Sequence, residues 1–321
     1  MKMSVASKLL TLAVLGLWAS AAHSAQVLPP AADDDELVPT GKGWGERATP
    51  VPGFVTHGNN GNANGQSRKV PGNGINYHGG PVILGATNVY YIWYGNWTGN
   101  SATTILTDLA NYIGGSPYFN INTTYYTTYF TGSNQYVSNA VRYAGSSNDA
   151  YSHGTALSDS NVQSIVANQI SSGVLPKDTN AVYFVLTSAD VNETSGFCTQ
   201  YCGWHTHGTI GSSDIKYAFI GNPDRCPSAC ASQTKSPNGN AGADGMASII
   251  AHELEEAVTD PDLNAWYDTR GYENADKCAW TFGATSTAAN GSLYNVTLGG
   301  RQYLIQRNWV NDSGGYCSMS Y

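Results

Sequence analysis

Three stretches that each contain an apolar run mark the buried strands that the sequence predicts. They are residues 88–94, 180–191 and 215–223, each rich in Val, Ile, Tyr or Phe and bounded by Gly, Asn, Asp or Pro. A run that is apolar on both faces is typical of a strand with layers packed on both sides. Near the end of the chain we expect a hairpin that turns at Gly299-Gly300.

Two segments between these runs repeat apolar positions at helical spacing. Residues 101–114 open at Ser101 and close at Gly114, and residues 157–173 carry a cap at Ser158 or Asp159. Strands that alternate with helices predict an α/β (α+β) fold with a mixed sheet. We expect a single domain over residues 78–321, which is within single-domain size.

A third predicted helix, residues 246–258, contains no Gly or Pro. Asp244 is its expected cap, and the Thr-Asp-Pro sequence at 259–261 is its expected stop, because the residue before a proline avoids helical geometry. At about 100° per residue, Glu253 falls inside the apolar arc of this helix, whereas Glu255 falls outside it. An unpaired buried carboxylate costs several kcal/mol, so Glu253 needs a compensating partner or a chemical task.

His252 and Glu256 flank this acid in an H-E-x-x-E string. Positions i and i+4 of a helix are neighbours. In the H-E-x-x-H helix of zinc peptidases, the first and fifth residues bind the ion and the second is the general base. Glu256 can also ligate zinc, although the added oxygen leaves other divalent ions open. The structural alternative is that Glu253 pairs with a buried Arg or Lys and that His252 is a core histidine.

Acids that follow the helix offer a third ligand. Residues 271–278 resemble a short helical turn with Glu273 and Asp276 on one side. We expect Asp276 to be a ligand, and Glu273 to be a ligand or a neighbour that orients one. Asp262 stands where the metzincin pattern has its third ligand, but Thr259 replaces the glycine of that pattern, so Asp262 ranks third. A capping or surface role is the alternative for each acid.

The stretch CGWHTHG places two histidines two residues apart. His205 and His207 share one face if the segment is extended. There they could ligate the ion, stabilise an oxyanion or contact substrate, and His153 is a weaker candidate of the same kind. A polar loop made rigid by a disulfide is the alternative. The sequence has no G-x-S-x-G elbow and no phosphate-binding glycine loop.

The chain begins with the features of a secretory signal peptide. Lys2 and Lys8 precede an apolar run at residues 9–18 and then small residues, so we expect residues 1–25 to be a signal that is removed. The protein is then secreted or extracellular, in the cell wall or the periplasm. Residues 26–77 are acidic at first and later dominated by Gly and Asn, which predicts a propeptide-like leader or linker that could cover a cleft.

Composition argues against two classes of function. The chain carries 15 Lys and Arg against 23 Asp and Glu, a net charge of −8 at pH 7. This balance disfavours nucleic-acid binding and adhesion to anionic membranes. Beyond the signal, the sequence holds no segment long and apolar enough to span a bilayer. We expect a monomer whose partner is a peptide or a cell-wall polymer.

Six cysteines form an even set, as expected for disulfides in an exported chain. They are Cys198, Cys202, Cys226, Cys230, Cys278 and Cys317. We favour the local pairs inside the two C-x3-C strings, with Cys278 bound to Cys317. The alternative is a structural zinc site built from the two strings.

Several stretches resemble the EXORDIUM family, also called phosphate-induced protein 1. They are HGGPVI, NVYYIWYGNW, VYFVLTSADVNETSGFCTQYCGWH, AFIGNPDRCPSAC, DGMASIIAHELEEAVTDP and GGRQYLI. The resemblance implies a growth-related protein secreted to the cell wall, in a family without an established biochemical activity. Plant members typically lack counterparts of His252 and Glu253 and have a small residue near Asp276. This difference implies either a metal centre kept in this chain or an incidental acidic string.

The residues together predict a secreted zinc-dependent hydrolase, with a metallopeptidase of zincin-like architecture as the leading hypothesis. The expected ion ligands are His252, Glu256, Asp276 and Glu273. The expected catalytic residues are Glu253 as general base and His205 or His207 at the oxyanion. Two alternatives are a non-catalytic secreted protein that binds cell-wall material or a receptor, and a structural ion such as calcium in the same acids.

Overall fold

The computed structural model describes residues 38–42 and 74–321. These residues belong to the unit Ala32–Tyr321, and the second unit of the chain, Met1–Ala31, lies outside the described residues. The expected signal peptide and most of the expected leader therefore fall outside the description. Within the described residues, none of the helices is long and apolar enough to cross a membrane.

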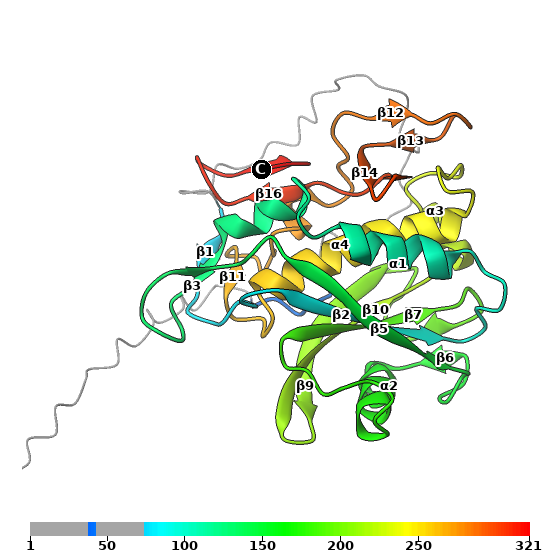
Figure 1. Ribbon diagram of the computed structural model, residues 1–321, viewed down its shortest axis with the longest axis horizontal. Helices are drawn as coiled ribbons and strands as arrows, with labels where there is room; N and C mark the ends of the chain where they lie inside the picture. Colours follow the sequence, from blue (N-terminus) through cyan, green and yellow to red (C-terminus); the bar gives the residue numbers. More distant parts are fainter. Residues whose placement is uncertain (1–37, 43–73) are drawn as a thin grey trace, which may run out of the picture. The chain divides into compact units, whose positions relative to one another are not determined.

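A mixed sheet of five strands in the order β5-β2-β7-β10-β9 organises the fold (Figure 1). The strands are β2 (Thr87–Tyr94), β5 (Val141–Asp149), β7 (Ala181–Thr187), β9 (Gly203–Ile210) and β10 (Ser213–Ile220). The strands β5, β2, β7 and β10 run parallel to one another. β9 pairs antiparallel with β10 at the edge of the sheet. The three predicted apolar runs are confirmed as β2, β7 and β10, in a mixed α+β fold.

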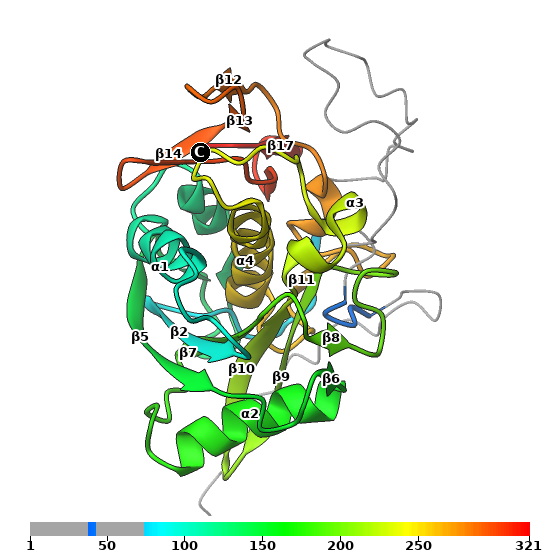
Figure 2. The same ribbon diagram turned by 90° about the vertical axis from the view of Figure 1, so that its right-hand side faces the viewer.

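Helices cover both faces of this sheet, which explains why its inner strands are apolar throughout. α1 (Ala102–Tyr112) and α4 (Ala241–Thr259) lie on one face, and α2 (Asp159–Ser171) lies on the other (Figure 2). The expected cap of α2 is confirmed as Ser158, whose side chain forms a capping box with Asn161.

Short elements make up the rest of the described fold. The strand pairs are β1 (Asn76–Tyr77) with β11 (Trp266–Tyr267), β3 (Tyr126–Thr127) with β4 (Gln135–Tyr136), β6 (Ala156–Leu157) with β8 (Asn192–Glu193), β12 (Ser286–Thr287) with β13 (Leu293–Tyr294), β14 (Val296–Leu298) with β15 (Arg301–Tyr303), and β16 (Asn308–Val310) with β17 (Tyr316–Ser318). The short helical segments are η1 (Phe119–Thr124), η2 (Pro223–Arg225), α3 (Pro227–Cys230) and η3 (Asp276–Cys278). The hairpin at Gly299-Gly300 is confirmed as β14-β15, and β1 begins ahead of the expected domain start at residue 78.

Helix α4 is buried on every side. All its residues from Gly242 to Thr259 are buried, because the sheet covers one side, α1 lies beside the helix, and β15 and η1 contact it as well (Figures 1 and 2). The prediction that Glu255 lies outside the buried arc is therefore wrong. Tyr118, just before η1, donates its hydroxyl to Glu255 Oε2 at 2.9 Å.

The start of α4 also differs from the prediction, at Ala241 rather than at residue 246. Asn240 is the N-cap, and its side chain accepts a hydrogen bond from the Ala243 N–H at 3.0 Å. The expected cap, Asp244, lies inside the helix and accepts the Asn238 N–H at 2.9 Å. Glycines within this first stretch of the helix disfavour helical structure by propensity, and the sequence pattern therefore placed the start too late.

The six cysteines form three disulfides. They join Cys198 to Cys226, Cys202 to Cys230 and Cys278 to Cys317. The predicted pairs inside each C-x3-C string are wrong, because each string bonds to the other string, whereas the third pair is confirmed. None of the six cysteines is free, so the alternative of a cysteine zinc site is also wrong. The first two disulfides both connect the loop before β9 to the segment around α3.

Candidate metal centre

Three of the predicted site residues lie on one stretch of α4. His252, Glu253 and Glu256 are each 1% exposed. Gly203 at the start of β9 lets the helix approach the strand, because a Cβ there would lie 2.5 Å from Ile249 Cγ2 and 3.1 Å from Glu253 Oε1. Glu253 is thereby held against β9, inside the fold, as the helical arc predicts.

The predicted third ligand joins two of these residues. His252 Nε2 lies 3.0 Å from Glu256 Oε1 and 3.6 Å from Asp276 Oδ1. Asp276 begins η3, and its backbone N–H donates to Glu256 Oε1 at 3.1 Å. One ligand atom from each of His252, Glu256 and Asp276 lies within 4.8 Å of the other two. The structure thus brings together three residues that the sequence pattern selected as ligands.

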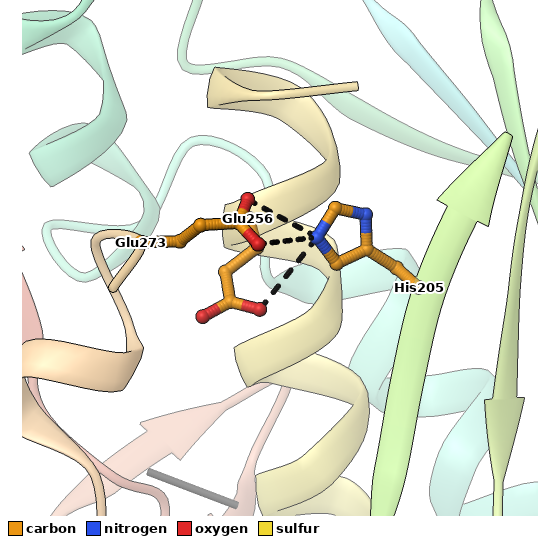
Figure 3. Close-up of side chains that lie close together, drawn as sticks. All are labelled: His205, Glu256 and Glu273. Atoms are coloured by element: carbon orange, nitrogen blue, oxygen red, sulfur yellow. Dashed lines mark hydrogen bonds and ion pairs between the residues drawn. The ribbon is translucent and has the colours of Figure 1, made fainter. Parts of the chain in front are cut away.

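A second set of candidate ion ligands shares Glu256 with the first set (Figure 3). His205 Nε2 lies 3.2 Å from both carboxylate oxygens of Glu273 and 3.7 Å from Glu256 Oε2. His205 reaches this point from β9, whereas Glu273 comes from the loop before η3 (Figure 3). The four predicted ligands and His205 therefore form one continuous buried cluster.

The distances within the set of His252, Glu256 and Asp276 are compatible with ligands around one ion. Zinc bonds to nitrogen or oxygen of about 2.0–2.1 Å in a tetrahedron place neighbouring ligand atoms roughly 3.3 Å apart. The distances from His252 Nε2 to Glu256 and Asp276, 3.0 and 3.6 Å, bracket that value. The donors are imidazole nitrogen and carboxylate oxygen, which suit zinc and other first-row divalent ions.

Burial perturbs the titration of these groups strongly. It raises the pKa of Glu273 well above its usual range, and the charges of Glu256 and Asp260 add to the effect. Burial, together with Asp276, also raises the pKa of Glu256. The pKa of His205 is lowered to about 4 by burial, although Glu256 opposes the shift. Each shift disfavours charge on its group in the absence of a compensating ion.

The ion pairs of Glu256 and Glu273 with described residues are all with histidines. Among the described residues, no Arg or Lys forms an ion pair with either of these two acids. A divalent cation among the donors would favour the ionised carboxylates and the neutral imidazoles. The residues present thus fit a bound ion.

The remaining sequence candidates lie apart from this cluster. His207 Nδ1 lies 2.8 Å from Asp214 Oδ1, in a half-buried group with Asp262. Lys216 Nζ lies 3.1 Å from Asp262 Oδ1, so a lysine already supplies the positive charge in this group. His205 and His207 do lie two residues apart on β9, but only His205 reaches the buried cluster. His153 Nδ1 lies near the Asn161 side-chain amide at the start of α2.

Two buried residues near the acids of α4 were not selected as site residues from the sequence. Asp260 is fully buried at the end of α4, and its Oδ1 accepts the N–H groups of Asn264 and Ala265 at 2.6 and 2.5 Å. Its place in the Asp-Pro turn is a signal that could have identified it. Tyr118, which holds Glu255, carries no comparable signal because it lies far away in the sequence.

Comparisons with known proteins agree on one family. The model of the phosphate-induced protein 1 conserved region matches residues 75–319. Protein EXORDIUM-like 3 of Arabidopsis thaliana is 34% identical over 273 residues, which cover 73% of this chain and 80% of that relative. Protein EXORDIUM-like 5 of the same plant is 33% identical over 275 residues, with coverage of 73% and 75%.

A tobacco relative extends the comparison to a second plant. Protein PHOSPHATE-INDUCED 1 of Nicotiana tabacum is 26% identical over 272 residues, which cover 72% of this chain and 83% of that relative. No solved structure matches the chain. With the family model matched over most of its length, this chain belongs to the EXORDIUM, or phosphate-induced protein 1, family.

Proposed function

We propose that this protein is an exported member of the family that holds one zinc ion and hydrolyses a peptide or a similar carbonyl substrate. The observation that carries the proposal is the convergence of His252, Glu256 and Asp276, whose ligand atoms lie within 4.8 Å of one another. Glu273 lies in the adjoining set with His205 and Glu256. Three disulfides support export, because such bonds persist in oxidising compartments.

The residues around the ligands have separable tasks in this proposal. When bound, the ion would lower the pKa of a water molecule toward about 7 and polarise a carbonyl group. Glu253, held against β9 by the packing at Gly203, would accept the water's proton on its carboxylate. His205 Nε2 faces Glu273 at 3.2 Å, so we assign His205 to orienting that acid rather than to an oxyanion. We assign no catalytic role to His207.

The proposed architecture is zincin-like. It rests on the H-E-x-x-E string of α4 and on the antiparallel edge strand β9, which α4 contacts. We also propose that the protein is a monomer and that its partner is a peptide or a cell-wall polymer.

Family membership favours a second function, that of a non-catalytic extracellular protein. The relatives with the names EXORDIUM-like and PHOSPHATE-INDUCED carry no enzymatic term in those names. The deep burial of His252 and Glu256 is also typical of a structural site. In this case the ion, zinc or calcium, would stabilise the fold. The comparisons alone favour this second function, whereas the inward position of Glu253 favours hydrolysis.

One assay separates the two functions. The purified full-length protein is incubated with a casein-type substrate, first with zinc, then with a chelator, and then with zinc restored. Hydrolysis that is lost on chelation and regained with zinc supports the first function. Loss of thermal stability on chelation without any hydrolysis supports the second.

A further inference from the structure

A short upstream segment contacts β9, the edge strand of the central sheet. The backbone N–H of His205 on β9 donates to the Gly41 carbonyl at 3.0 Å. Gly41 has φ +67°, and a Cβ there would lie 1.8 Å from the His205 carbonyl oxygen. Only glycine permits this approach. The segment therefore meets the same residue whose side chain enters the buried cluster.

The residue after this glycine fills a polar and aromatic subsite. Lys42 Nζ lies 2.6 Å from Asp159 Oδ2 and 2.7 Å from Ser195 Oγ. The same ammonium lies 5.3 Å from the Tyr201 ring centroid and 5.5 Å from that of Trp204. A carboxylate, a hydroxyl and two aromatic faces are the groups that recognise an ammonium side chain.

The walls of this subsite are fixed by a hydrogen-bond network behind them. Ser195 Oγ lies 2.8 Å from Asp159 Oδ1 and 3.0 Å from Glu193 Oε2. The hydroxyl of Tyr201 donates to Glu193, which is buried. Two carboxylates linked through one hydroxyl give the subsite a negative charge that a cation satisfies. Burial works to raise the pKa of Asp159, but hydrogen bonds from Lys42 and Ser195 lower it overall.

Further backbone groups of β9 point to the edge beside this subsite. Alternate residues of a strand point their backbone N–H and C=O groups to the same edge, so Gly203 and His207 present theirs to the side on which His205 meets Gly41. An extended peptide can add to such an edge through its main chain. Its backbone would then pass His205, next to the donors of the metal centre.

We propose that this edge is a peptide-binding site that takes a lysine side chain into the subsite of Asp159, Ser195, Tyr201 and Trp204. The chain's own Gly41-Lys42 is its intramolecular occupant. The inference rests on the proposed function only for the fate of the bound peptide, since binding needs neither the ion nor hydrolysis. It assigns the class of ligand as a peptide with a Gly-Lys sequence.

Lys42 is bound weakly enough for an external peptide to displace it. The ion pair of Lys42 with Asp159 is partly solvated, with side-chain exposures of 26% and 50%, and such pairs contribute little to stability. An intramolecular occupant competes at an effective concentration on the order of millimolar. External peptides should therefore bind weakly to the wild type and more tightly once Lys42 is removed.

The test uses the full chain and a synthetic peptide with the sequence of residues 38–42, blocked at both ends. Its dissociation constant is measured by calorimetry for the wild type, Lys42→Gln and Lys42→Gln/Asp159→Asn. Lys42→Gln should bind the peptide roughly tenfold or more tighter than the wild type does, and the added Asp159→Asn should reverse the gain. Lys177→Gln removes an exposed lysine elsewhere and should behave as the wild type does.

Three results would overturn the inference. The first is a Lys42→Gln variant that stays folded and binds no peptide, which would make the segment a structural strap only. The second is equal binding of a peptide that carries Gln in place of Lys. The third is binding that is insensitive to Asp159→Asn. A protein that binds the peptide but neither holds an ion nor hydrolyses would contradict the proposed function and leave this inference intact.

Discussion

Glu256 belongs to both sets of candidate ion ligands. Its Oε1 lies 3.0 Å from His252 Nε2, and its Oε2 lies 3.7 Å from His205 Nε2. The spacing of His252 and Glu256 on one helix predicted the first contact. It could not predict the second, because spacing along a helix does not say which strand faces it. The same limit applies to Glu273, whose place beside His205 is set by a loop.

Replacing Glu253 tests the proposed general base. Glu253→Gln is expected to keep the bound ion and to lose hydrolysis by a factor of roughly 10²–10⁴, because the amide cannot accept the proton of water. Ion content and hydrolysis of a casein-type substrate are the two measurements. Full hydrolytic activity in this variant would end the assigned role of Glu253.

Glu255→Gln is the matched control for that variant. Glu255 is also buried on α4, and burial raises its pKa well above its usual range. The amide is uncharged and keeps an acceptor oxygen for the Tyr118 hydroxyl. We expect this variant to fold and to retain hydrolysis within about twofold, as is usual for a near-isosteric change.

The titration of Asp260 gives a pH-dependent prediction. Burial, with help from Asp262 and Glu256, raises the pKa of Asp260 from 3.8 to about 7, against hydrogen bonds from Ala265 and Asn264. The folded chain then holds a proton that the unfolded chain releases. The stability from this proton is complete below pH 3.8 and is lost as the pH rises through about 7, by up to about 4 kcal/mol.

The Asp260 prediction is measured by urea unfolding of the chelated protein across this pH window. Its free energy of unfolding should fall more steeply with rising pH in the wild type than in Asp260→Asn, which does not titrate. Asn keeps an acceptor oxygen for the Asn264 and Ala265 N–H groups. Identical pH slopes for the two proteins would show that Asp260 titrates normally.

At the scale of elements, α4 shows what a helical pattern can and cannot predict. Its existence, its C-terminal stop and the inward position of Glu253 follow from periodicity and from the Asp-Pro turn. The burial of Glu255 does not, because its partner Tyr118 and the segments η1 and β15 that contact α4 come from distant parts of the chain. The pairing of the first four cysteines could not be predicted either, because spacing alone does not fix disulfide connectivity.

The close approach of α4 to β9 predicts a large effect of a small substitution. Gly203→Ala would place a methyl group 2.5 Å from Ile249 Cγ2 and 2.9 Å from the Phe219 carbonyl oxygen. We expect the free energy of unfolding to fall by about 1–3 kcal/mol through overpacking. The same methyl group would also lie 3.1 Å from Glu253 Oε1, so hydrolysis should fall with stability.

Gly208→Ala on the same strand is the matched control for Gly203→Ala. Its Cβ would meet the side-chain amide of Gln163 at 2.7 Å, and this flexible group can rotate away. The control should change the free energy of unfolding by no more than about 0.5 kcal/mol. Equal effects of the two substitutions, measured by urea unfolding, would contradict a tight helix-strand contact at Gly203.

At the scale of the whole molecule, the sequence predicts the family and the order of elements better than the contacts between distant segments. The predicted strands and helices occur in the fold, and the resemblance covers nearly the same residues as the family match to 75–319. Residues 38–42 belong to a stretch whose composition indicates a solvated linker. Pro39 and Gly41 are nevertheless buried, because Gly41 fits against β9 and Lys42 meets Asp159.

The central claim is that the buried cluster holds a divalent cation. The most direct test is elemental analysis of the full-length protein, purified without chelator, by mass spectrometry. We predict about one zinc ion per chain, as for a single site with these donors. The ion should fall to background in His252→Ala and in Glu256→Gln, and it should stay in His207→Ala, whose imidazole lies in the separate group with Asp214. A wild-type protein without a stoichiometric ion, or an ion that survives both His252→Ala and Glu256→Gln, would contradict the account.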